Sequence, residues 1–570
     1  MKHQPSFQRA LKRITILAMT YLLFSCASAE FIDLGDAPQV NVAPDTQTVI
    51  IQTSGLFDGL GDLELLALCQ GMPERVYSQF AAKLMCFQSV LARANYVTEQ
   101  RQQAIGSFNR LLAVAMTAYQ VLSPEEQAFG DLRIRLNNNI NGYDTFYQVE
   151  NMRSRDPRLP IQIDGELGLP LVAYRTNLGS IADKHYPAEG LFHAVSLTLE
   201  TVEFGDEAIE INLRLISNNK ENIIVETQPY ALRFSPNAAY LLLIENATLD
   251  DLKFTGLINP AAVEARMGVF AITPIEAHKT PVLMIHGLNS DPLVWRYITN
   301  DILNTPELND RFMVLHAFYG SGSPPFYNAM RIRREMDHFI SYHNIETDNK
   351  SLVVLGHSMG GIIGNTIVSD SSYALWDATF KLRPEDINSE LTREVQDVFM
   401  FRPKFDYNQI YFIDTPHRGS QTAKSFVGRV GSALVTLPQN VVDLFAMFID
   451  EVGIENLSER MLPFLGNRTA NSVEVLRPQH PLMEVLADLP IKGDAFSIIG
   501  SNGDLSCESE FQCMQITDGV VDYVSALHPQ SKYRLIVPSR HDSYQNQDAI
   551  TFILESLKSK PSLTPQASFQ

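Results

Sequence analysis

The six-residue segment GHSMGG, Gly356–Gly361, limits the architecture of this chain more than any other stretch. It directly follows a short apolar run, Ser351–Leu355, and an apolar segment with helical spacing follows it. A strand that passes through a tight turn directly into a helix needs small residues around the turn, because the backbones approach closely there. The pattern predicts that Ser358 stands at the tip of this turn, with its hydroxyl at the N-terminus of the helix.

Further short apolar runs predict the sheet around this turn; they lie at 281–285, 410–413, 496–499 and 533–537. Continuous apolar runs separated by helix-like segments are typical of parallel strands that are covered on both faces. We expect residues 261–560 to form such an α/β domain and residues 561–570 to form a tail. The segment at about 421–492 is too long for a plain loop. It predicts a helical cap over the site, with an apolar inner face.

The first half of the chain is predicted to contain two more regions. Apolar residues from Ile105 to Leu122 recur at steps of three and four, so we expect a helical region over 59–160. Residues Ile209–Leu215 alternate between apolar and polar, as in a half-buried strand, and we expect a small β-sandwich-like domain over 161–260. Residues 30–58 are polar with scattered prolines and are expected to form a tether.

The N-terminus has the pattern of an export signal, which we place at residues 1–29. A basic segment, Met1–Arg13, precedes an apolar run of 11 residues, too short to cross a bilayer. Ala27–Ala29 suits cleavage after Ala29, whereas Leu23–Cys26 resembles a lipobox that would place a lipid on Cys26. The lipidated chain would be a bacterial envelope protein, anchored in the outer membrane and facing the periplasm or the surface. The cleaved chain would be soluble in the periplasm or secreted.

The net charge of the chain limits which partners it can bind. Its cysteines and histidines limit which disulfides and metal sites it can form. The chain has 45 Lys and Arg against 65 Asp and Glu, a formal net charge of −20. This excludes a nucleic-acid partner, which requires a basic face. In an oxidising compartment we predict the disulfides Cys69–Cys86 and Cys507–Cys513, with four buried thiols as the alternative. The histidines are dispersed and no cysteines have ligand spacing, so we expect no metal and no other cofactor.

A serine in such a turn needs a general base and an acid that orients the base. In chains with a nucleophile in this setting, the order is serine, acid, histidine. His541 follows the last predicted strand and is the last histidine, so we assign it as the general base for Ser358. Asp518 follows the preceding strand and is the first choice for the acid. Asp414, at the end of the strand before that, and Asp522 are the alternatives.

An acyl-transfer site also needs two N–H donors for the developing oxyanion. One is expected from Met359, directly after the serine. The other is expected from Leu288, in the segment His286–Asn289 that follows the first core strand. Gly287 would let this backbone come close, and His286 is expected to support the loop rather than act as a base.

These segments together resemble the α/β-hydrolases of the lipase and esterase class, including bacterial lipase-like and GPI-inositol-deacylase-like sequences. The resemblance is carried, in the family's order, by Pro281–Asn289 with Trp295, Gly356–Gly361, Thr415–Ser420, Asp518–Val521 and His541. It implies an α/β-hydrolase fold and ester or thioester acyl chemistry, and it does not extend to residues 30–255. Relatives often have a small residue before Thr-Pro-His, where this chain has Asp414. Because of this departure, Asp414 remains an alternative to Asp518 as the acid that orients His541.

The residues and the resemblance predict an exported serine hydrolase that cleaves carboxylic esters, with a lipid ester as the expected substrate. Two alternatives stay open. One is an acyltransferase that passes the same acyl-enzyme intermediate to an alcohol. The other is a catalytically inert envelope lipoprotein with a binding role, against which the complete set of nucleophile, base, acid and donor loops argues.

Overall fold

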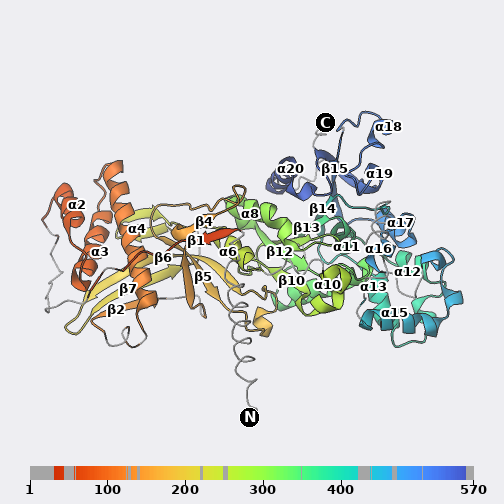
Figure 1. The fold of residues 1–570 in the computed structure, drawn as a ribbon, viewed down its shortest axis with the longest axis horizontal. Coiled ribbons are helices and arrows are strands. Elements are labelled where there is room, and N and C mark those ends of the chain that lie inside the picture. The colour runs from red at the N-terminus through yellow and green to blue at the C-terminus, as the bar shows by residue number, and fades with distance from the viewer. Residues whose placement is uncertain are drawn as a thin grey trace, which may run out of the picture.

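A seven-stranded sheet forms the centre of the C-terminal half of the chain (Figure 1). Its order is β10-β12-β11-β13-β14-β15-β16, and every neighbouring pair is parallel except β10 and β12. The strands are β10 (Gly268–Ala271), β11 (Thr280–Ile285), β12 (Phe312–Phe318), β13 (Ser351–His357), β14 (Tyr407–Ile413), β15 (Gly493–Ser501) and β16 (Ser531–Pro538). This confirms the predicted mostly parallel sheet.

Helices cover both faces of this sheet. The helices of this half are α8 (Arg296–Asn304), α9 (Pro306–Arg311), α10 (Pro325–Tyr342), α11 (Met359–Val368), α12 (Ala374–Thr379), α13 (Thr392–Phe399), α15 (Gln439–Val452), α16 (Ser472–Val475), α17 (Pro481–Asp488), α18 (Glu510–Cys513), α19 (Tyr523–Ala526) and α20 (Gln547–Lys558). In β11, Leu283 and Ile285 join the core beneath α10 and α11, whereas Val282 and Met284 join the core beneath α8 and α20. Burial on both faces explains why the strand sequences are continuously apolar.

The N-terminal half combines helices and a second sheet. Its elements are β1 (Ile32–Leu34), α2 (Asp62–Gly71), α3 (Tyr77–Leu91), α4 (Thr98–Val121), β2 (Leu132–Asn137), β3 (Thr145–Gln148), β4 (Met152–Ser154), β5 (Leu169–Arg175), β6 (Leu191–Phe204), β7 (Ile209–Ile216), β8 (Asn222–Val225), β9 (Gln228–Ala231) and α6 (Ala238–Asn246). Five strands form one sheet in the order β2-β7-β6-β5-β3, while β1 pairs with β4 and β8 pairs with β9.

Helices fill only the first part of the region predicted as helical, 59–160, because β2, β3 and β4 lie in its second part. The helices and the strands of this half also share one core. Phe87 of α3 and Phe108 of α4 are buried in the same cluster as Leu171 and Leu213 of the sheet. The layer over this sheet is helical, which corrects the expectation of a sandwich-like arrangement of two sheets. The physical reason is that α3 and α4 each carry an apolar face that needs a partner, and the sheet supplies it.

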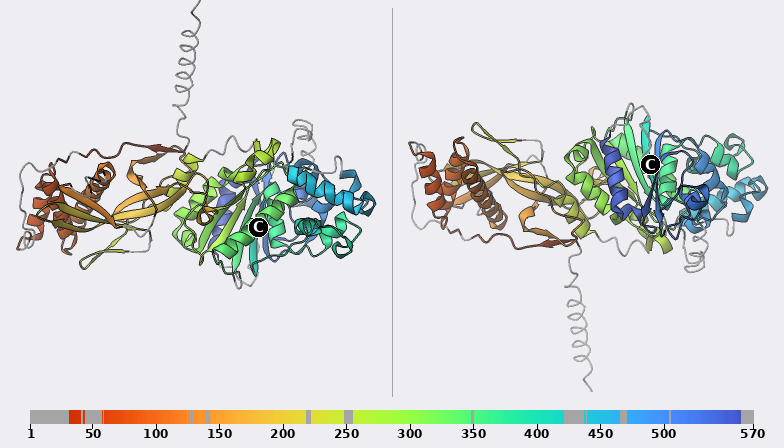
Figure 2. Two further views of the ribbon diagram at one scale, coloured as in Figure 1. Left: turned by 90° about the horizontal axis from the view of Figure 1, so that it is seen from below. Right: turned by 90° about the horizontal axis from the view of Figure 1, so that it is seen from above.

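The two halves meet along α6. A single buried cluster contains Val172 and Phe192 of the N-terminal sheet, Leu241 of α6 and Val282 of the C-terminal sheet. The molecule is elongated, with α2, α3 and α4 at one end and α12, α13 and α15 at the other (Figures 1 and 2).

The far end of the C-terminal half is a helical layer held together by aromatic side chains. Phe448 of α15 packs against Trp376 and Phe380, with ring centroids 6.2 and 5.4 Å apart, respectively. Phe445 lies 6.5 Å from Phe399 of α13. Helices α15, α16 and α17 fall within the predicted cap segment, 421–492, and their apolar faces pack as core.

The structure is a computed structural model and describes residues 31–559 except 41, 44–56, 58, 124, 126, 128–129, 138–141, 218–221, 248–254, 348–349, 421–436, 438, 465–470 and 504. The predicted signal, its Cys26, the tail and much of the predicted tether lie outside these residues. None of the helices described here is long and apolar enough to span a bilayer. The predicted Cys69–Cys86 disulfide is present and joins α2 to α3, with the Cα atoms 5.5 Å apart.

Candidate active site

Ser358 occupies the tight turn between β13 and α11, as the sequence predicts. It is the N-cap of α11 and has φ 52° and ψ −122°, a strained backbone conformation for a residue with a side chain. Its N–H donates a hydrogen bond to the carbonyl oxygen of Ile413, 2.8 Å away, at the end of the neighbouring strand β14. This hydrogen bond fixes the turn to the sheet. The hydroxyl lies between the end of β13 and the start of α11.

The glycines of this turn are required by close backbone contacts. A Cβ atom on Gly360 would overlap the carbonyl oxygen of Ile285 in β11, and a Cβ atom on Gly356 would lie 2.5 Å from the Cα of Gly361. Only residues without a side chain let helix and strand approach this closely.

The substitution Gly360→Ala is therefore expected to destabilise the fold, by about 3 kcal/mol, because the backbone of β11 cannot move aside easily. Thermal unfolding followed by circular dichroism would show a lowered midpoint. Gly106→Ala is the matched control, since a Cβ atom there meets nothing within 4 Å. That control should leave the midpoint unchanged or raise it, and an equal midpoint for both variants would contradict the close-packed turn.

The three residues predicted as nucleophile, base and acid lie in one hydrogen-bonded row. His541 Nε2 is 2.9 Å from Ser358 Oγ. His541 Nδ1 is 2.7 Å from Asp518 Oδ2. The side chain of Asp518 is 2% exposed and that of His541 is 20% exposed. The row therefore runs from a buried carboxylate to a hydroxyl at the turn, with one imidazole between them.

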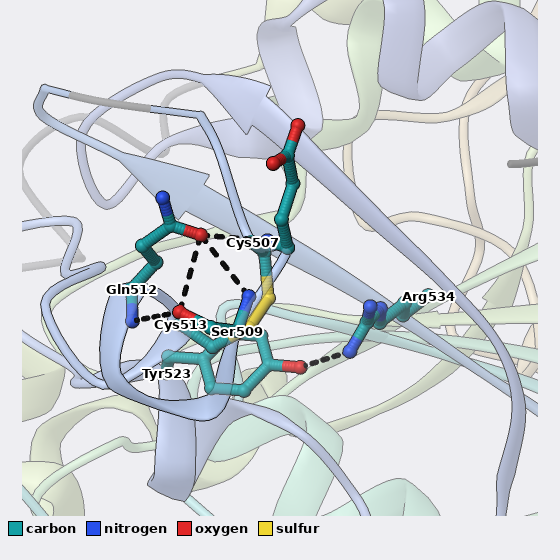
Figure 3. The surroundings of a disulfide bond; sticks show 7 residues. Cys507, Ser509, Gln512, Cys513, Tyr523 and Arg534 are labelled. Carbon is teal, nitrogen blue, oxygen red and sulfur yellow. Dashed lines mark hydrogen bonds between the residues drawn. A yellow bond between two sulfur atoms is a disulfide. The ribbon is translucent and has the colours of Figure 1, made fainter.

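The Asp518 carboxylate is positioned by its own loop. Its Oδ1 accepts hydrogen bonds from the N–H groups of Val520 and Val521, both at 2.7 Å, which leaves Oδ2 for the imidazole. The predicted Cys507–Cys513 disulfide is present and closes the segment before this loop (Figure 3). The N-terminal end of α19, directly after the loop, is held by a hydrogen bond from Arg534 Nη1 to the hydroxyl of Tyr523, 2.6 Å away (Figure 3).

Asp414 has different partners. Its Oδ1 accepts hydrogen bonds from the N–H of Gly500 (2.8 Å) and the hydroxyl of Ser543 (2.9 Å), and its Oδ2 accepts one from the N–H of Ser543 (3.0 Å). No hydrogen bond joins Asp414 to His541, although both are described. The carboxylate instead ties the end of β15 to the loop that carries the histidine. Asp522, the remaining alternative acid, is the N-cap of α19.

The carboxylates around His541 make its imidazole more basic. Burial lowers its pKa, but the hydrogen bond and charge of Asp518, with the charges of Asp414 and Asp542, outweigh burial and raise the pKa above 6.5. Burial raises the pKa of Asp414, an effect that the nearby His541 opposes. The ring of His357 is also buried, and burial holds its pKa well below the ordinary value.

The expected oxyanion loop runs against the nucleophile. A Cβ atom on Gly287 would lie 3.0 Å from Ser358 Cβ, so this backbone is as close as a glycine allows. Leu288 follows in the same loop, and Met359 opens α11, where the first N–H groups have no partner inside the helix. His286 Nδ1 lies 2.9 Å from the carbonyl oxygen of Gly287, which ties its ring to its own loop.

Sequence reasoning missed the residues that support the row. His357 Nε2 lies 3.2 Å from the carbonyl oxygen of His541, and Ser543 joins the same loop to Asp414. Neither contact has a spacing signal, because the partners are far apart in the chain. Ligand-type atoms of His357, Asp414 and His541 lie within 4.8 Å of one another. The oxygens of Asp414 and both nitrogens of His541 already have hydrogen-bond partners, so we assign this group to the support of the row and not to a metal.

No family model and no curated protein matches this chain. Solved structures are similar over about half of it. The mature lipase BlEst2 of Bacillus licheniformis is 15% identical with a TM-score of 0.30, over 51% of this chain and 98% of that one. Esterase B of Lactobacillus rhamnosis is 14% identical with a TM-score of 0.28, over 50% and 75%. A thioesterase domain from the curacin biosynthetic pathway is 15% identical with a TM-score of 0.25, over 50% and 92%.

The order and connections of the chain's own strands and helices define its fold. A mostly parallel sheet passes from β13 through the turn at Ser358 into α11, helices cover both faces, and the histidine follows the last strand. The C-terminal half of this chain therefore has an α/β-hydrolase fold.

Proposed function

We propose that the chain is a serine hydrolase that cleaves carboxylic esters through an acyl-enzyme intermediate. The observation that carries the proposal is the row Ser358, His541, Asp518, with contacts of 2.9 and 2.7 Å. A serine hydroxyl is a weak nucleophile unless a neighbouring base removes its proton, and this row provides the base and a carboxylate that orients it.

The proposed reaction has two halves. Ser358 Oγ attacks the ester carbonyl carbon while His541 Nε2 takes the hydroxyl proton and Asp518 stabilises the imidazolium. The N–H groups of Leu288 and Met359 hold the oxyanion, and His541 returns the proton to the leaving alcohol as the C–O bond breaks. Water, activated by the same imidazole, then attacks the acyl-enzyme and releases the acid.

A lipid ester is the proposed substrate class. The helical layer at the far end has a small, partly open apolar cavity of about 80 Å³, whose lining includes Phe326, Phe380, Phe445 and Leu482. Apolar walls of this kind suit an acyl chain. Export is part of the same proposal, with anchoring through Cys26. The two disulfides support it, since such bonds persist in oxidising compartments.

The pH dependence of the reaction follows from His541. The base must be neutral to accept the serine proton, and a raised pKa keeps it protonated to higher pH. We therefore expect kcat/KM to rise with pH and to reach half of its plateau above pH 6.5. A profile of kcat/KM from pH 5 to 9 measures this, and a midpoint below about 6 would contradict the geometry of the row.

The function is tested with p-nitrophenyl esters of increasing acyl length and with an emulsified triglyceride. The proposal expects saturable hydrolysis, with the highest kcat/KM on chains long enough to enter the apolar cavity. A purified, folded protein that hydrolyses none of these esters, with or without detergent, would refute it.

A further inference from the structure

Three histidines form a hydrogen-bonded chain where the N-terminal half contacts α10. His185 Nδ1 lies 3.0 Å from His343 Nε2, and His185 Nε2 lies 3.2 Å from His338 Nδ1. His185 follows a short 3-10 turn, Ile181–Asp183, and is 1% exposed. His338 lies in the last turns of α10 and His343 is the residue that caps it. Both nitrogens of a buried imidazole are thus used to hold one half of the molecule on the other.

The number of protons on the three histidines decides whether both hydrogen bonds can form. With all three rings neutral, His185 donates one hydrogen bond and accepts the other. One added proton is tolerated, because a charged end ring can donate to His185, which then donates to the opposite end. A second proton charges both ends, so both present an N–H to His185. A neutral imidazole has only one nitrogen that accepts, and one bond is lost.

The geometry of the three rings fits a chain of hydrogen bonds better than a metal site. His338 and His343 contact opposite nitrogens of His185, and one imidazole offers a metal ion only one of its two lone-pair directions. A single ion therefore could not be bound by all three rings in this arrangement.

The surroundings do not favour the charged form. Lys184, the neighbour of His185 in sequence, is a positive charge and pairs with Glu335 at 3.0 Å. Burial, followed by the charges of His343, His338 and Lys184, lowers the pKa of His185 to about 3. Burial and the charge of His338 also lower the pKa of His343.

The remaining charges nearby are already paired. Asp337 of α10 pairs with Lys404 at 3.3 Å. Asp183, the last residue of the 3-10 turn, accepts two hydrogen bonds from Arg175. No described carboxylate forms a hydrogen bond with any of the three rings.

We propose that His338, His185 and His343 form a pH-sensitive latch that holds segment 177–190 against α10 at neutral pH and releases it in mild acid. The free segment binds more protons than the latched one, so the latched state is stable above the ordinary histidine pKa of about 6.5 and loses stability as pH falls below it. The same segment forms a wall of a cavity of about 480 Å³ between the two halves, with Leu243 of α6 and Phe318 of β12 on other walls. Release of the latch would open this cavity.

Hydrogen–deuterium exchange of the full chain tests the latch, with exchange times corrected for the intrinsic effect of pH. The amide of Ala271 donates to the carbonyl oxygen of His185 at 2.8 Å, so peptides covering 177–190 and 268–275 report on it. In the wild type, we expect protection of these peptides to fall about tenfold or more from pH 7.5 to 5.5. Peptides of the central strand β13 should not change.

The variant His338→Gln makes the test specific. Glutamine can still donate to or accept from His185, but it takes up no proton when the segment is released, so the fall in protection should be markedly shallower than in the wild type. His343→Gln should behave in the same way. His278→Gln is the matched control, because His278 is 71% exposed and lies outside the cluster. A wild-type protection that does not change with pH, or a fall that is as steep in His338→Gln as in the wild type, would overturn the latch.

Discussion

The substitution Ser358→Ala is expected to lower kcat for ester hydrolysis by at least about 10⁴-fold, because it removes the hydroxyl that we propose forms the acyl-enzyme. The hydroxyl is 2.9 Å from His541 Nε2, and its loss leaves the base with nothing to deprotonate but water. The fold should survive, since the turn is fixed by its backbone hydrogen bond to Ile413 and by close contacts of the neighbouring glycines.

The measurement is steady-state hydrolysis of a p-nitrophenyl ester, beside thermal unfolding of each protein. Ser341→Ala is a suitable control, because this exposed hydroxyl only donates to the carbonyl oxygen of Asp337 in its own helix. That control should keep wild-type kinetics. Retention of more than a tenth of kcat by a folded Ser358→Ala protein would exclude Ser358 as the nucleophile.

Asp518→Asn is expected to lower kcat by about 10³- to 10⁴-fold, the second largest effect. The carboxylate oxygen Oδ2 accepts a hydrogen bond from His541 Nδ1 at 2.7 Å and stabilises the imidazolium that forms during attack. An amide carries no charge. It also lets the imidazole adopt the wrong tautomer, in which Nε2 carries the proton and cannot accept another from serine.

Asp414→Asn is the matched comparison for this prediction. Asp414 accepts its hydrogen bonds from Gly500 and Ser543 and none from His541, so its loss acts through the position of the loop and through the charge that helps to raise the pKa of His541. We expect a loss of kcat within about tenfold, with a lowered unfolding midpoint from the disturbed buried contacts. A larger loss of kcat in Asp414→Asn than in Asp518→Asn would show that the acid had been assigned to the wrong residue.

The turn and the order of the site residues were predictable because they are local or follow from strand order. Gly356 and Gly360 bracket Ser358 in sequence, and His541 follows the last strand. The choice between Asp414 and Asp518 was harder. Both follow adjacent parallel strands and so reach the same edge of the sheet. The choice depends on the orientation of each carboxylate, which contacts from distant loops determine.

The N-terminal half shows a second limit of sequence patterns. Alternation in Ile209–Leu215 correctly indicates that one face of the strand is buried, but it does not say whether a sheet or a helix covers that face. Here α3 and α4 do so. The histidine chain was invisible for a related reason, since His185 lies more than 150 residues from both partners.

Covalent labelling with a fluorophosphonate tests the central claim most directly, because such reagents react with serines that a neighbouring base activates. The protein would be labelled without its signal segment, digested, and analysed by mass spectrometry. We predict one adduct per chain, on Ser358, that is absent from Ser358→Ala and from protein denatured before labelling. A folded protein, tested with and without detergent, that stays unlabelled or is labelled on another serine would contradict the account.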